Sequence, residues 1–381
     1  SRSGSRPPVG LASGVGAASE ARTMAQARPG VYYCRQASRC IAPLAGVEDG
    51  RHRFLVGTCA VQQRNELHVI EFSEDTSEIV CRQVAPHPEE VWNLSVSPAD
   101  PSHVLTYSAG GSPGALNLYR LPEAGESAPL ERLGGISGNE AQLSAVKSAL
   151  WDTLRPGTLV VADSEALHVF DCASGSPQLQ EASTIQVGQR CSAACLDPHH
   201  VGQVSTVDET HLKTWDLRSN KLAFRRDGAH LFGVRDVDYN PNVPYQVLTA
   251  GEDAALRFWD LRKLDRSLRS LSGGHHHWIV RARHNGHHDQ LVVSCGTDSA
   301  VCLWRAASVA SLPLGEESSA GHSGAGAPPP DGLIRRYEEH EDSCYSCCWS
   351  ASDAWVFASV AYDGRVVVNR VPGEEKYRIL L

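Results

Sequence analysis

Short hydrophobic runs separated by turn residues recur along the chain, and they predict β-strands. The runs are four to seven residues long, are rich in β-branched residues and lie between Gly, Pro, Asp and Asn turns. Helical periodicity, with apolar residues at every third or fourth position, is almost absent. The chain is therefore predicted to be all-β, with strands in the segments 54–58, 67–72, 104–107, 159–162, 247–250, 291–295 and 356–360.

These runs repeat in a fixed order, most clearly in residues 228–262 and 274–305. Three residue types keep a spacing of 45 residues between the two segments, in the pairs His230 and His275, Asp253 and Asp298, and Trp259 and Trp304. A period of about 40 to 45 residues with a Gly-His-like start and a Trp-Asp end is typical of WD40 repeats, each of which forms one four-stranded blade of a β-propeller.

Counting outward from these two repeats gives seven units, so the predicted fold class is an all-β, seven-bladed WD40 β-propeller over residues 31–381. The units are predicted near residues 31–85, 86–122, 138–178, 188–224, 229–271, 274–337 and 338–381.

Three segments depart from the repeat. Residues 1–30 are rich in Gly, Ser, Ala and Arg without an apolar pattern, and they are expected to be a disordered N-terminal extension. Residues 308–332 interrupt unit six with low-complexity sequence, so they are expected to form a loop insert whose deletion leaves the fold intact. The hydrophobic end KYRILL (376–381) is expected to supply a strand around residues 377–380 that completes the last blade.

The repeats also predict buried polar networks. The His before the first strand, a Ser or Thr of the second, the Asp of the tight turn and the Trp of the third can form one hydrogen-bonded chain, which fixes blade geometry because each buried donor meets an acceptor. The predicted members are His230, Thr249, Asp253 and Trp259 in unit five, His275, Ser294, Asp298 and Trp304 in unit six, and His340, Ser359 and Asp363 in unit seven. Unit seven has Asn369 where the Trp is expected.

Charge and composition exclude several functional classes. The chain has 44 Asp and Glu against 35 Lys and Arg, a formal charge of −9, with both signs mixed along the sequence, so no nucleic-acid partner is expected. No apolar run reaches the roughly 18 to 20 residues of a membrane helix, which argues against direct membrane insertion. The 12 cysteines are sparse, and we interpret them as reduced thiols of a cytoplasmic protein.

Candidate catalytic and metal-binding patterns are weak. Cys191, Cys195, His199 and His200 have a metal-like composition, but an extended strand holds the two cysteines about 13 Å apart, too far for one zinc ion. Paired carboxylates, a phosphate loop and a nucleotide fingerprint are missing from the sequence. We therefore expect a protein-binding scaffold that is not an enzyme and needs no cofactor or metal.

Candidate partner-binding residues lie at the two rims of the predicted propeller. The position four residues before the aromatic or apolar anchor of each first strand is expected at the top rim, which selects Trp92, Lys147, Arg235 and Tyr345, with Trp278 nearby. The alternative is that these side chains only seal the central channel. Two Trp-Asp-x-Arg endings place Arg218 and Arg262 at the bottom rim, where they either dock a second protein or pair with the Asp of their own blade.

Six segments resemble one particular family, the EARP and GARP complex-interacting WD40 proteins. The resemblance covers about residues 31–381, and its most specific part is the last unit with the carboxyl tail. The segments are RFLVGT (53–58), SVSPADP (95–101), VRDVDYNPN (234–242), YEEHEDS (337–343), YDGRVVVNRVP (362–372) and KYRILL (376–381).

The resemblance implies a non-enzymatic adaptor that binds EARP/GARP-type tethering complexes. It implies a peripheral location at endosomes and the trans-Golgi network, and a role in retrograde transport and endocytic recycling. Similar plant proteins resemble substrate receptors of a cullin-RING ubiquitin ligase that dock through Trp-Asp-x-Arg boxes, and here Arg218 and Arg262 match those boxes. A weaker resemblance, shared by many propellers, is to the receptor for an amino-terminal peroxisomal targeting signal.

Overall fold

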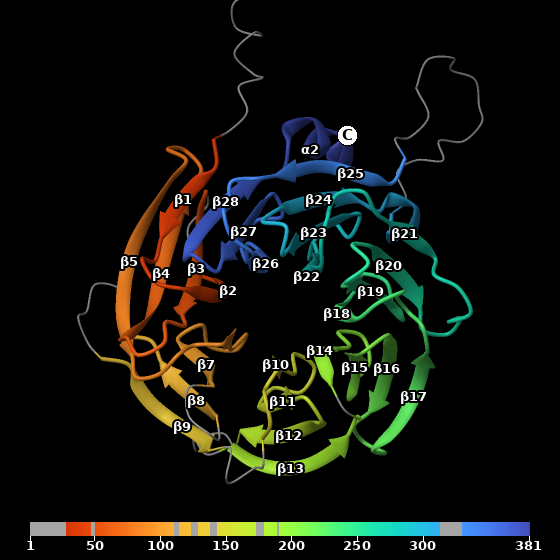
Figure 1. Cartoon of the computed structure of the whole chain (residues 1–381), viewed down its shortest axis with the longest axis horizontal. Coiled ribbons are helices and arrows are strands. Elements are labelled where there is room, and N and C mark those ends of the chain that lie inside the picture. Colours follow the sequence, from red (N-terminus) through yellow and green to blue (C-terminus); the bar gives the residue numbers. More distant parts are fainter. Residues whose placement is uncertain are drawn as a thin grey trace, which may run out of the picture.

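Seven four-stranded antiparallel sheets stand like blades around a central axis (Figure 1). The computed structural model describes residues 28–46, 50–109, 114–122, 129–137, 143–172, 179–188, 190–312 and 330–381. The predicted all-β, seven-bladed propeller is confirmed. We call the face at which the first strand of each blade begins the upper face, and the opposite one the lower face.

Blades one to six each use four consecutive strands, with the first innermost and the last outermost. Blade one contains β2 (Ser38–Leu44), β3 (Arg51–Thr58), β4 (Asn65–Ser73) and β5 (Glu78–His87). Blade two contains β6 (Asn93–Val96), β7 (His103–Ser108), β8 (Ala115–Arg120) and β9 (Glu131–Ser137). Blade three contains β10 (Ser148–Trp151), β11 (Thr158–Ala162), β12 (Ala166–Cys172) and β13 (Leu179–Gln186). Blade four contains β14 (Cys191–Leu196), β15 (Gln203–Asp208), β16 (His211–Asp216) and β17 (Lys221–Arg226). Blade five contains β18 (Val234–Tyr239), β19 (Gln246–Gly251), β20 (Leu256–Asp260) and β21 (Arg269–Leu271). Blade six contains β22 (Ile279–His284), β23 (Leu291–Gly296), β24 (Val301–Arg305) and β25 (Gly332–Tyr337). The predicted units 86–122 and 138–178 were too short, because each missed its outer strand.

Burial explains why the middle strands are continuous hydrophobic runs while the outer strands are not. Every residue of β23 is buried, since both faces of a blade are covered by neighbouring blades. The outer strand β5 instead alternates exposed and half-buried residues along most of its length, because one of its faces meets solvent. The core therefore lies between blades, as where Phe258 of β20 and Trp304 of β24 share one cluster.

The ring closes by a different route from the one predicted. Blade seven contains β26 (Cys344–Trp349), β27 (Val356–Ala361) and β28 (Arg365–Arg370), and its outer strand is β1 (Gly30–Tyr33) from the other end of the chain. The antiparallel register runs from Gly30 opposite Val368 to Tyr33 opposite Arg365. Gly30 fits here because a Cβ would lie 2.8 Å from the Phe72 ring.

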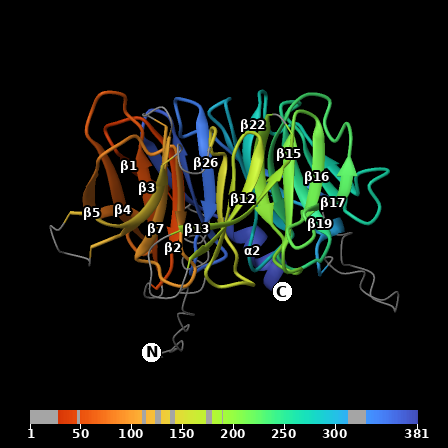
Figure 2. The same cartoon turned by 90° about the horizontal axis from the view of Figure 1, so that it is seen from below.

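The carboxyl end is a helix, so the prediction of a strand around residues 377–380 was wrong. Helix α2 (Gly373–Leu380) lies on the lower face (Figure 2). Its buried Glu375 accepts two hydrogen bonds from the guanidinium of Arg305 in β24, one of them 2.6 Å long. Ile379 packs on the core, whereas Leu380 and Leu381 remain exposed, so the hydrophobic character of this segment does not lead to its complete burial. No helix in the described ranges is long and apolar enough to cross a membrane.

The predicted insert, residues 308–332, makes specific contacts at its amino-terminal flank. The backbone N–H and the hydroxyl of Ser311 both donate to Asp289, at 2.7 and 2.8 Å. Residues 313–329 of the insert lie outside the described residues. The deletion predicted to be harmless must therefore spare the flanks.

Replacing residues 313–329 with a six-residue Gly-Ser linker should change the free energy of unfolding by less than about 1 kcal/mol, because loop-closure entropy depends only logarithmically on length. Deleting the full segment 308–332 should cost more, since it also removes Ser311 and Asp331, and Asp331 forms a 3.0 Å ion pair with Arg269. Urea unfolding of both variants checks this. Equal stability of the two deletions would show that the flank contacts contribute nothing.

Candidate functional site

Bulges near the start of the innermost strands direct side chains towards the central axis at the upper face. In five of the seven first strands the register with the second strand skips one residue near the strand start. A bulge leaves that residue unpaired and turns its side chain away from the ladder. The skipped residues are Arg39, Ser192, Arg235, Val280 and Tyr345.

These positions line a cavity of about 490 Å³ on the upper face, which we call the mouth. Four of the five residues predicted for the top rim lie in its wall, namely Trp92, Lys147, Arg235 and Tyr345. The fifth, Trp278, stands beside it, with its ring 4.6 Å from the Arg235 guanidinium carbon. The structure thus brings the predicted residues together, while their role in binding a partner stays a prediction.

Arg39 belongs to the same wall and was not predicted. Its guanidinium carbon lies 4.5 Å from the centre of the Trp92 ring and 4.3 Å from that of Tyr345, so it joins the aromatic residues of blades two and seven. The rule that selected the other residues would have found Arg39, four positions before Pro43, if the first strand of blade one had been placed at β2. The pattern of that strand is less regular than those of the later blades.

The polar networks of blades five and six form as predicted. In blade five, His230 bonds Asp253 at 2.7 Å and Thr249 at 2.8 Å, and the indole N–H of Trp259 donates to Thr249 at 2.9 Å. Burial of Asp253 opposes its ionisation, but the hydrogen bond to His230 outweighs this and holds the pKa of Asp253 well below its usual range. The matching distances in blade six are 2.9, 2.8 and 2.7 Å, for His275 to Asp298, His275 to Ser294 and Trp304 to Ser294.

The network of blade seven is incomplete, which corrects the prediction for Asp363. The Nε2 of His340 bonds Ser359 at 2.8 Å, but its Nδ1 is buried without a hydrogen-bond partner among the described residues. Asp363 is exposed and accepts the backbone N–H of Arg365 instead. Desolvation of the ring therefore dominates and lowers the pKa of His340 to about 4.

Protonation of His340 should make the protein less stable in acid. Because its pKa is about 4 in the folded protein and about 6.5 when unfolded, its contribution is complete above pH 6.5 and is lost as the pH falls towards 4, by about 3 kcal/mol in all. Urea unfolding between pH 7 and 4.5 should give a shallower pH dependence for His340→Gln than for the unchanged chain. Parallel curves would contradict this assignment.

Blade two contains a network that the sequence reasoning missed. His87 bonds Thr106 at 3.1 Å, and these residues are 19 positions apart. The same spacing of 19 separates His230 from Thr249, His275 from Ser294 and His340 from Ser359. A search for His and Ser or Thr at this spacing would have found His87, although blade two lacks the Trp-Asp ending.

The two Trp-Asp-x-Arg arginines lie on the lower face and pair within their own blades. Arg262 donates two hydrogen bonds to Asp260, at 2.9 and 2.8 Å, and Arg218 donates two longer ones to Asp216, at 3.2 and 3.3 Å. The hydrogen bonds from the arginines lower the pKa of both aspartates. Both guanidinium groups nevertheless remain exposed, which leaves them accessible from the lower face.

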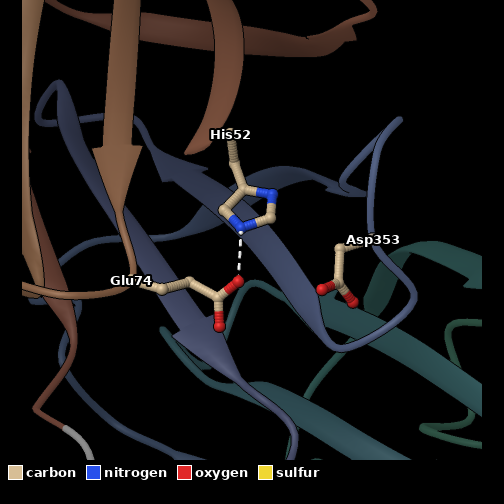
Figure 3. A group of neighbouring side chains, drawn as sticks. All are labelled: His52, Glu74 and Asp353. Carbon is tan, nitrogen blue, oxygen red and sulfur yellow. Dashed lines mark hydrogen bonds and ion pairs between the residues drawn. The ribbon is translucent and has the colours of Figure 1, made fainter. Parts of the chain in front are cut away.

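Among the residues that the structure describes, one group of side chains has the composition and spacing of a metal site. His52 in β3, Glu74 after β4 and Asp353 between β26 and β27 bring ligand atoms within 4.8 Å of one another (Figure 3). The two ring nitrogens of His52 are already hydrogen-bonded, to Glu74 at 3.1 Å and to Ser350 at 2.9 Å. We therefore interpret this group as part of the seam between blades one and seven.

Comparisons with known proteins agree with this architecture. The model of the EIPR1 beta-propeller family matches residues 27–304, and the WD domain, G-beta repeat model matches residues 332–368. The human "EARP and GARP complex-interacting protein 1" is 33% identical, with 93% of this chain and 99% of that protein covered. The "WD repeat-containing protein DWA2" of Arabidopsis thaliana is 32% identical (89% and 95% covered), and the "EARP-interacting protein 1" of Caenorhabditis elegans 27% identical (90% and 96% covered). The chain therefore belongs to the EIPR1 beta-propeller family.

Proposed function

We propose that this chain is a non-enzymatic WD40 adaptor that binds EARP/GARP-type tethering complexes. In this role it is a cytoplasmic protein held at endosomes and the trans-Golgi network through its partners, and it supports endosome-to-Golgi retrograde transport and endocytic recycling. The observation that carries the proposal is the near full-length similarity to a human protein whose name states that it interacts with the EARP and GARP complexes.

The mouth on the upper face is the surface we assign to the tether. It combines basic side chains with half-exposed Trp92 in its wall and half-exposed Trp278 beside it. Trp and Arg are residue types that often dominate the energetics of protein interfaces. Trp92 and Trp278 are 40% and 39% exposed, so their rings are available to a partner. The blade networks hold these rings on a rigid frame, which lowers the entropic cost of binding.

The alternative, a substrate receptor of a cullin-RING ubiquitin ligase, would use Arg218 and Arg262 on the lower face. Each of these arginines already has a carboxylate partner in its own blade, so docking would have to share or replace that pair. The two functions therefore predict binding on opposite faces of the ring.

Affinity purification of the tagged chain from its native cells, followed by mass spectrometry, tests the proposal. We expect tether subunits in the precipitate. The variant Trp92→Ala/Tyr345→Ala should lose them, because truncating an interface anchor costs about 2 kcal/mol or more, roughly a 30-fold loss of affinity. The matched variant Arg218→Ala/Arg262→Ala should retain them. The alternative would be supported if the unchanged chain captures cullin-ligase adaptor subunits and no tether subunits, and if Arg218→Ala/Arg262→Ala no longer captures those adaptor subunits.

A further inference from the structure

The mouth concentrates positive charge in a chain whose formal charge is −9. Five of its lining residues are cationic, and each lies in or just before the first strand of a different blade. Among the described residues, a single carboxylate lines the mouth with them. The cations are Arg39, Lys147, Arg190, Arg235 and Arg281, and the carboxylate is Asp236.

Asp236 does not neutralise these cations, because it is already paired. Its carboxylate accepts the backbone N–H of Ala282 at 2.9 Å and a hydrogen bond from Arg283 at 2.6 Å. Arg283 is a half-buried side chain outside the wall of the mouth. Its desolvation is outweighed by the carboxylates of Asp236 and Asp238, so its pKa is raised. The charge of Asp236 is thus balanced by Arg283.

Three of the five cations have no acidic partner among the described residues, namely Arg39, Lys147 and Arg281. Arg190 is 3.6 Å from Glu209, with both side chains more than half exposed, a geometry that contributes little binding energy in water. Arg235 is paired with Glu252 beside the Trp278 ring. The mouth therefore keeps most of its positive charge free for a ligand.

Aromatic contacts prepare Arg39 for an anionic group. Its guanidinium lies over the rings of Trp92 and Tyr345. These cation–π contacts involve the face of the guanidinium and do not occupy its N–H groups. The five N–H donors of an arginine lie in the guanidinium plane and match a carboxylate in a bidentate geometry. Arg39 is therefore held in place with donors available.

We infer that the mouth binds an extended acidic segment of a partner protein, whose carboxylates pair with Arg39, Lys147 and Arg281. This inference rests on the proposed function, because an adaptor that binds tethering complexes takes a protein as its ligand. A membrane surface fits less well, because the cations line a recess and do not form a flat patch. A long nucleic acid would extend past the mouth over a chain of net negative charge.

The probe for this inference is a fluorescein-labelled peptide of eight glutamates, titrated against the purified full chain and followed by fluorescence anisotropy. An eight-residue glutamine peptide controls for shape without charge. We expect the glutamate peptide to bind and the glutamine peptide to bind at least tenfold more weakly. Raising NaCl from 50 to 300 mM should weaken the glutamate complex, since salt screens exposed charges.

The decisive variant is Lys147→Glu/Arg190→Glu, which reverses two exposed charges at the mouth without touching a buried group. Its matched control is Lys221→Glu/Lys263→Glu, which makes the same change in net charge at exposed positions away from the mouth. The mouth variant should bind the glutamate peptide at least tenfold more weakly, and the control less than threefold. Equal losses in both variants would overturn the inference, because they would show attraction to net charge alone.

Two further arms identify other occupants. The first arm uses vesicles with 30% phosphatidylserine, and the second uses inositol hexakisphosphate. The inference would also be overturned if the glutamate peptide fails to bind while either of these probes binds the unchanged chain and not the mouth variant. Failure of the proposed function is seen separately, because the peptide titration needs no tether subunit. If the peptide binds but no tether subunits are captured, the proposed tether-binding function is wrong and the inference about the acidic segment stands. If tether subunits are captured but the peptide does not bind, the inference is wrong and the proposed function stands.

Discussion

Removing β1 should prevent stable closure of the ring. A chain that begins at residue 37 lacks Gly30–Tyr33, so the hydrogen-bonding edge of β28 is left unpaired and the contacts of Tyr32 and buried Cys34 with the core are lost. We expect a loss of about 5 kcal/mol or more in the free energy of unfolding, from several ladder hydrogen bonds and the buried apolar surface. The exposed edge should also promote self-association.

The control for this truncation is a chain that begins at Arg28 and keeps β1. Urea unfolding and size-exclusion chromatography of the two proteins give the measurement. The control should elute as the full-length chain does, whereas the shorter protein should unfold at lower urea or elute as aggregates. If both truncations behave alike, the ring does not depend on β1 for closure.

Replacing Trp259 by alanine should destabilise the protein by about 3 to 5 kcal/mol, because a large aromatic side chain is removed from a close-packed site. Trp259 is only 2% exposed and belongs to a cluster that links blades four and five. Its indole N–H donates to Thr249, but Thr249 keeps its bond to His230, so the cavity and not the lost hydrogen bond should dominate.

The variant Trp259→Phe separates these two contributions. It keeps most of the ring volume and loses the N–H donor, so we expect a cost of about 1 to 2 kcal/mol. Chemical denaturation followed by circular dichroism measures both variants against the unchanged chain. Stability of Trp259→Ala equal to the unchanged chain would mean that the residue is not buried between blades.

Repeat spacing made the fold predictable. The His, Asp and Trp positions of blades five and six recur every 45 residues, and the structure places each group in one buried network. Such networks join residues within one blade, such as His275 and Asp298, 23 positions apart. Local spacing therefore encodes them, and the count of seven blades follows.

The mouth was partly predictable for the same reason. Trp92, Lys147, Arg235 and Tyr345 share a position relative to a strand anchor, and a constant position in the repeat means a constant position on the ring. Arg39 was missed because the irregular first strand of blade one hid that position. Which partner enters the mouth does not follow from the repeat, because side chains at the rim are free of the packing constraints that fix the core.

Three outcomes depended on side-chain contacts that the repeat pattern does not specify, although the residues involved are only two positions apart. Asp363 matches the repeat but lies exposed, and its carboxylate accepts the backbone N–H of Arg365 while the Nδ1 of His340 has no hydrogen-bond partner among the described residues. Arg218 and Arg262 carry a docking-like motif, and their nearest carboxylates turned out to be in their own blades.

The sequence by itself determined the blade, the number of blades and the chemistry of the networks, because these depend on residues within one repeat. Only the tertiary structure decided which end of the chain closes the ring. Both β1 and the carboxyl end lie beside blade seven, but β28 has room for one partner strand, and Gly30–Tyr33 occupies it. The carboxyl end instead forms α2, because Glu375 meets the guanidinium of Arg305 across 70 positions of sequence, a contact that no local pattern reveals.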